Sequence, residues 1–150
     1  QALAHVLPQS PRPWLHIAEE VAAEAAARGY RRIGILGTRW LVDSGVYPDK
    51  LAAEGLDHVR PGQEDRDALA RIIMDELVYG VFKPESVARL QAIIGNLRDA
   101  GCDAVVLGCT ELPLVLNDGN SALPTLDSTR ILARAALTRA LQPPDARQPR

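Results

Sequence analysis

The sequence predicts an α/β protein in which a parallel sheet carries helices on both faces. Two short apolar runs with the composition of buried strands, residues 31–36 and 103–107, are separated by amphipathic segments with helical spacing. Strands that alternate with helices are typical of parallel sheets, because each parallel crossover needs a helix-sized connection. With 150 residues, the chain has the length of one such domain.

The first half of the chain predicts a helix, a buried strand and a shorter helix. Ile17, Val21 and Ala25 fall on one face of the first helix, and Gly29 is a typical residue to follow its end. The predicted elements are, in order, a helix over 14–28, a strand over 31–36, a loop over 39–48, a short helix over 49–54 and a weak strand over 56–60.

The second half predicts two long helices before the central strand. Pro84 suits the first turn of the second of these helices, and Gly101 suits its end. The predicted elements are helices over 63–80 and 84–100, the central strand over 103–107, a short helix over 112–116, a polar loop over 117–121, a strand over 123–126, and a last helix that Asp127 or Ser128 caps and that runs to Leu141.

Proline marks both ends of the predicted domain. Three prolines within residues 1–13 prevent a continuous helix, so this segment is predicted to be a linker or the stump of a preceding element. Residues 14–142 are predicted to form the α/β unit, and residues 143–150 a flexible tail that again contains three prolines.

Charge and cysteine content favour a small-molecule partner in a reducing compartment. The 17 basic and 19 acidic residues leave a net charge of −2 with no run of one sign, which argues against nucleic-acid and membrane surfaces. No apolar run approaches the ~20 residues of a membrane helix. Cys102 and Cys109 flank the central strand, and its extended length of about 23 Å excludes a disulfide between them. Free thiols favour a cytoplasmic location.

The central strand runs directly into Gly108, Cys109, Thr110 and Glu111. The carboxyl end of a parallel strand faces the crevice where ligands bind, so Cys109 is the candidate reactive group. A helix start after Cys109 would favour its thiolate, whereas Glu111 would oppose it, which leaves the net effect open. The alternative interpretation is a cysteine that is merely packed in the core.

A second strand end has similar chemistry, since Gly37 and Thr38 follow the first predicted strand. The ends of the two predicted strands therefore indicate one shared site. The glycine pair Gly34 and Gly37 is only weak evidence for nucleotide binding, because the full dinucleotide pattern is absent. Isolated histidines such as His5 and His16 are more often structural or solvated than metal ligands, so no metal site is predicted.

The residues Gly108 to Pro113 resemble the second cysteine motif of the aspartate/glutamate racemase family. The residue Glu111 places the resemblance in the amino-acid racemase branch, because the glutamate branch usually has His there. The resemblance extends over Trp14 to Leu141 and includes three further motif regions and a turn. These are Leu15 to Ala18, Gly34 to Arg39, Ser44 to Tyr47, and Asp127 to Thr129.

This resemblance implies a cofactor-independent amino-acid racemase built from two flavodoxin-like lobes, each of which gives one cysteine to the cleft between them. The chain matches the second lobe, so we expect a fragment, inactive alone, whose missing first lobe would precede Gln1. The motif implies that Cys109 is one acid/base, that Thr38 and Thr110 bind the substrate carboxylate, and that Glu111 binds the ammonium group. Without its partner lobe, the apolar interlobe face would favour a homodimer.

Three departures from the family pattern favour a less acidic substrate than aspartate or glutamate. Leu41 stands where relatives often have a second Thr, Leu132 where a His is common, and Tyr79 near a position where aspartate-specific members often have Lys. Two alternatives stay open. The first is a thiol-dependent decarboxylase or cis–trans isomerase of small dicarboxylates, and the second is a non-catalytic α/β binding module.

Overall fold

The computed structural model describes residue 10 and residues 14–141. The elements in chain order are α2 (Ile17–Ala27), β1 (Arg32–Leu36), α3 (Arg39–Asp43), α4 (Val46–Ala53), β2 (Asp57–Val59), α5 (Gln63–Asp75), the 3-10 helix η2 (Leu77–Tyr79), α6 (Pro84–Asp99), β3 (Ala104–Leu107), the 3-10 helix η3 (Leu112–Leu114), β4 (Thr125–Asp127) and α7 (Ser128–Leu141). Within this described part, no helix is both long and apolar enough to cross a bilayer. The segments expected to be a linker and a tail fall almost entirely outside these residues.

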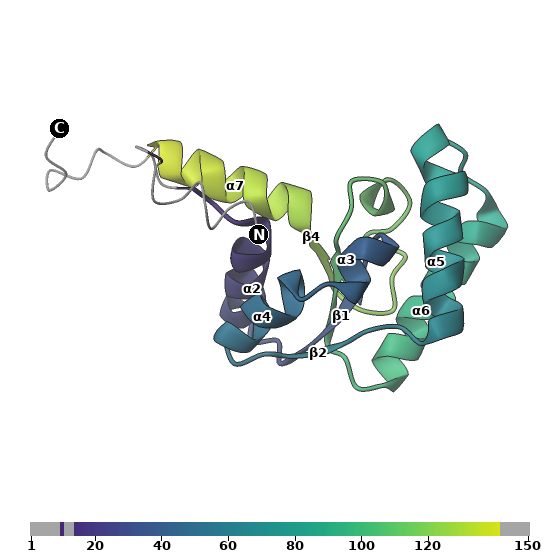
Figure 1. The fold of residues 1–150 in the computed structure, drawn as a ribbon, viewed down its shortest axis with the longest axis horizontal. Coiled ribbons are helices and arrows are strands. Elements are labelled where there is room, and N and C mark those ends of the chain that lie inside the picture. The colour runs from purple at the N-terminus through teal and green to yellow at the C-terminus, as the bar shows by residue number, and fades with distance from the viewer. Residues whose placement is uncertain (1–9, 11–13, 142–150) are drawn as a thin grey trace, which may run out of the picture.

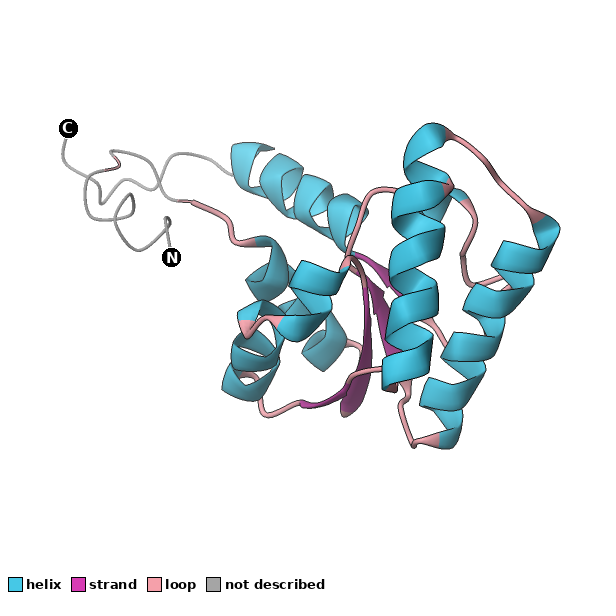
Figure 2. Ribbon diagram, turned by 45° about the vertical axis from the view of Figure 1, so that its right-hand side comes forward, coloured by secondary structure: helices cyan, strands magenta, loops and turns pink. Residues whose placement is uncertain are grey.

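The four strands form one sheet in the order β2-β1-β3-β4, and every neighbouring pair is parallel. Helices α2, α4 and α7 lie on one side of the sheet, and α5 and α6 lie on the other (Figures 1 and 2). The predicted fold class, a three-layer α/β lobe with helices on both faces, is therefore confirmed.

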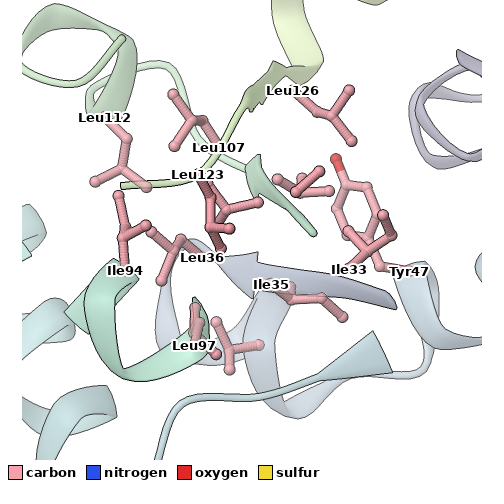
Figure 3. Close-up of a cluster of buried hydrophobic side chains, with 14 of the residues drawn as sticks. Ile33, Ile35, Leu36, Tyr47, Ile94, Leu97, Leu107, Leu112, Leu123 and Leu126 are labelled. Carbon is pink, nitrogen blue, oxygen red and sulfur yellow. The ribbon is translucent and has the colours of Figure 1, made fainter. Parts of the chain in front are cut away.

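The core explains why β3 and the part of β1 after Arg32 carry no polar side chain. Ile33 and Ile35 of β1 and all four residues of β3 are buried, since each strand is covered on both faces. Figure 3 shows Leu97 and Ile94 of α6 meeting the sheet from one side and Tyr47 of α4 from the other. The sheet thus holds the ends of β1 and β3 in a fixed relation to each other.

The predicted loop over 39–48 is wrong, because α3 and the first turn of α4 occupy it. Pro48 reads as a helix breaker in the sequence, but it lies in the first turn of α4, where its missing N–H is not needed. The predicted helix over 63–80 is also too long. It ends at Asp75, and a single 3-10 turn follows up to Gly80, which has a positive φ of 71°.

The predicted helix over 112–116 is reduced to the three-residue η3. The side chain of Asn120 donates to the carbonyl of Val115 at 2.8 Å and accepts from the N–H of Asn117 at 2.8 Å, so the chain turns away instead of continuing a helix. A single 3-10 turn has no extended macrodipole, which removes most of the helix effect expected to favour the Cys109 thiolate.

Candidate active site

The ends of β1 and β3 leave the sheet side by side. Leu36 pairs with Leu107 in the parallel register, and the N–H of Gly108 donates to the carbonyl of Leu36 at 2.8 Å. The residues that follow, Thr38 after β1 and Cys109 after β3, therefore start from adjacent positions at the same edge of the sheet. In Figure 1 the elements after these strands, α3 and the loop that contains η3, lie at that edge.

The space at this edge requires a glycine at position 108. A Cβ there would lie 2.7 Å from the carbonyl oxygen of Leu36 and would overlap a terminal methyl group of Leu41. The φ angle of Gly108 is not positive, so the requirement is one of close approach and not of backbone conformation. The backbone of β3 thus passes close against β1 just before Cys109.

The thiol of Cys109 is half-buried, and its surroundings raise its pKa to about 11. Burial is the largest cause, since it disfavours the thiolate. The backbone N–H groups of Leu112 and Glu111 act in the opposite direction, and the carboxylate of Glu111 raises the pKa further by charge and by a hydrogen bond. The sequence left open whether the thiol or the thiolate of Cys109 is favoured, and these surroundings favour the protonated thiol.

Thr110 and Glu111 form one polar unit beside the thiol. The hydroxyl of Thr110 donates to the Glu111 carboxylate at 2.7 Å, and this hydrogen bond is the main reason why the pKa of Glu111 lies below its usual value. Glu111 also interacts with Cys109. The structure therefore brings three of the four predicted site residues into contact and gives them one negative charge.

Thr38, the fourth predicted site residue, caps the start of α3 by position only. Thr38 is half-buried, and its side chain makes no capping hydrogen bond. The hydroxyl of Thr38 therefore does not act as a helix cap. Its place at the end of β1, next to the end of β3, is consistent with a shared site.

Two buried hydroxyl groups near Cys109 are not among the predicted site residues, although Ser128 is one of the two candidate caps of the last helix. Ser128 is 1% exposed and donates to the carbonyl of Leu107 at 2.8 Å, and Tyr47, also 1% exposed, forms a hydrogen bond with Ser128. Burial is the main cause of the raised pKa of Tyr47, and Cys109 contributes to it. Both residues belong to motifs that carry the family resemblance, which is the signal that could have identified them.

The other residues that the sequence singled out lie elsewhere or have structural roles. His16 caps α2 by accepting from the N–H of Ala18 at 3.2 Å, whereas His5 lies outside the described residues. Cys102 is buried where the chain enters β3, at the opposite end of that strand from Cys109. Leu132 is half-buried on α7, and Tyr79 is 76% exposed on η2. No group of three acidic, His or Cys residues within the described chain could hold a metal ion.

Comparison with known proteins identifies the family of this chain. The family model of Asp/Glu/Hydantoin racemases matches residues 1–136. The chain belongs to this racemase family. A Yersinia pestis structure assigned to the Asp/Glu racemases superimposes with a TM-score of 0.88 at 34% identity, and an aspartate racemase homologue from Pyrococcus horikoshii with 0.86 at 31% identity.

The curated relatives include a glutamate racemase from Beutenbergia cavernae, 36% identical over 63% of this chain, and the broad specificity amino-acid racemase RacX of Bacillus subtilis, 24% identical over 84% of it. The chain spans only part of each. It covers 31% and 54% of these two proteins, and 61% and 62% of the Yersinia and Pyrococcus structures, which themselves match 93% and 94% of this chain.

Proposed function

We propose that this chain is the second lobe of a cofactor-independent amino-acid racemase and supplies one of its two acid/base thiols, Cys109. The observation that carries the proposal is the contact of Cys109 with Glu111, which is hydrogen-bonded to Thr110, at the end of β3, in a chain that belongs to a racemase family. A first lobe, which would face this sheet edge, supplies the second thiol.

Racemisation requires one group that removes the α-proton and one on the opposite face that returns a proton. In this proposal the thiolate of the first lobe accepts the α-proton, and the protonated thiol of Cys109 donates its proton to the carbanion. Cys109 ends as the thiolate and the partner as the thiol, so the pair is ready for the opposite enantiomer. The raised pKa of Cys109 suits the role of acid in the resting state.

The groups around Cys109 suit the two charged ends of an amino acid. Thr38 and Thr110 offer hydroxyl donors to the α-carboxylate, and Glu111 pairs with the α-ammonium group. When the ammonium group neutralises Glu111, one cause of the raised thiol pKa disappears. Substrate binding thereby makes the thiolate of Cys109 more accessible for the reverse direction.

The test is hydrogen–deuterium exchange at the α-carbon of L- and D-amino acids in D₂O. The protein encoded by the intact gene is compared with this 150-residue chain and with Cys109→Ser and Cys102→Ser variants of the gene product. We expect exchange that is lost in Cys109→Ser and in the lone chain and kept in Cys102→Ser, because Cys102 lies at the far end of β3.

Absence of exchange with every amino acid would refute a racemase and leave the decarboxylase, isomerase and binding-module alternatives. Exchange that survives in Cys109→Ser would refute the role of this thiol. Equal losses in the two cysteine variants would indicate a structural effect, and thermal unfolding of each variant distinguishes that case.

A further inference from the structure

Leu41 lies over the point where the two strand ends meet. Its terminal methyl group fills the space directly above the backbone of Gly37 and Gly108. Leu41 is only half-buried, and it packs at the margin of the core, as does Cys109. Part of this leucine is therefore exposed close to the strand ends from which Gly108 and Cys109 continue.

The surroundings of the thiol contain negative charge without a matching positive charge. Among the described residues, the Glu111 carboxylate accepts from the hydroxyl of Thr110 at 2.7 Å and forms no ion pair. Arg39, which follows Thr38, forms ion pairs with Asp43 at 4.0 Å and Asp67 at 3.3 Å instead. A second carboxylate close to Glu111 would be repelled by its charge, and Arg39 is already paired with other carboxylates.

Three of the four substituents of a bound α-carbon have partners in the proposed function. The hydrogen faces a thiol, the carboxylate meets the hydroxyls of Thr38 and Thr110, and the ammonium group meets Glu111. The fourth substituent is the side chain. Leu41 lies over Gly108, the residue before Cys109, and its methyl groups can bind only an apolar side chain favourably.

We propose that the site selects amino acids with an uncharged, apolar side chain and that Leu41 is the residue that selects them. This inference rests on the proposed function. A pocket that gains or loses one methylene discriminates roughly 10-fold to 200-fold. We therefore expect the gene product to catalyse α-proton exchange with leucine or methionine at least tenfold more efficiently, in kcat/KM, than with aspartate or glutamate.

The test compares Leu41→Thr, Leu41→Val and Leu41→Met in the intact gene product, with the same D₂O assay. We expect Leu41→Thr to lower the ratio of leucine to aspartate efficiency about tenfold or more, because a hydroxyl replaces apolar contact surface. Leu41→Val, which removes one methylene, lowers leucine exchange with less effect on alanine. Leu41→Met, which keeps the volume and the apolar character, leaves the ratio within about threefold of the parent.

The outcomes separate this inference from the function on which it rests. Exchange that favours aspartate or glutamate in the parent protein would overturn the inference and leave the racemase intact, as would an unchanged ratio in Leu41→Thr and Leu41→Val. Absence of exchange with all amino acids would overturn both. If Leu41→Thr does not fold, as judged by circular dichroism, the ratio in Leu41→Val decides.

Discussion

Gly108→Ala tests whether the close approach of β3 to β1 is real. The new Cβ would lie 2.7 Å from the carbonyl oxygen of Leu36, the same atom that accepts the Gly108 N–H at 2.8 Å. The two strand ends must separate to relieve this overlap, and the hydrogen bond lengthens as they do. Overpacking of this kind costs about 1–3 kcal/mol, and a weakened buried hydrogen bond adds about 1 kcal/mol. We expect a total loss of about 2–4 kcal/mol in the free energy of unfolding.

Gly95→Ala is the matched control, because a Cβ at Gly95 in the interior of α6 meets no atom within 4 Å. Alanine stabilises a helix interior by roughly 0.5–1 kcal/mol relative to glycine, so this variant should unfold at higher urea concentration. With a slope of about 2 kcal/mol per molar urea, the middle of the usual range, Gly108→Ala should move the unfolding midpoint down by about 1–2 M. A midpoint within about 0.2 M of the parent would refute the close approach.

Three further predictions concern the thiol, a buried hydroxyl and a carboxylate. Iodoacetamide should label Cys109 of this chain about 100-fold more slowly at pH 7 than a free cysteine, because the raised thiol pKa leaves little thiolate. Peptide mass mapping should show faster labelling of Cys109 in Glu111→Gln, because the carboxylate contributes to the raised pKa. Equal labelling rates in the parent and in Glu111→Gln would contradict this. Ser128→Ala should lower the free energy of unfolding by about 1–3 kcal/mol, measured in urea, because it removes the donor to the end of β3; no change would contradict it. The Asp118 carboxylate accepts hydrogen bonds from the hydroxyl and the N–H of Thr125, both at 2.7 Å, and these bonds lower its pKa below the ordinary value of 3.8. The ionised carboxylate therefore stabilises the fold above pH 3.8, and this stabilisation is lost as the pH falls through the lowered pKa. Asp118→Asn should therefore be less stable than the parent at pH 7, and the difference should shrink near pH 2.

Much of the fold could be predicted because the strongest local patterns agree with the tertiary structure. The run of Val and Leu in β3 and the helical spacing of Leu90, Ile94 and Leu97 in α6 leave few other solutions. The errors fall where a short segment depends on its neighbours. Pro48 is compatible with both a loop and a first helical turn. The burial of its neighbour Tyr47 in the core accompanies the helical conformation, and this tertiary contact is not visible in the local sequence.

The candidate site could be predicted in its residues but not in its electrostatics. The motif around Cys109 identified the thiol and its neighbours, since they are adjacent in sequence. The direction of the thiol pKa depends on burial and on how closely Glu111 approaches, and neither is encoded locally. The role of Leu41 as a cover over Gly37 and Gly108 likewise needs the strand register, which joins segments about seventy residues apart.

The hydrogen bond from the N–H of Gly108 to the carbonyl of Leu36 holds the ends of β3 and β1 together. Ser128 adds a second link at the same level, from the start of α7 to the end of β3. Because both strands are also paired along their length, the backbone at the two strand ends cannot separate without breaking hydrogen bonds of the sheet. Thr38 and Cys109 therefore continue from two chain positions whose spacing is set by the sheet and not by the loops that follow.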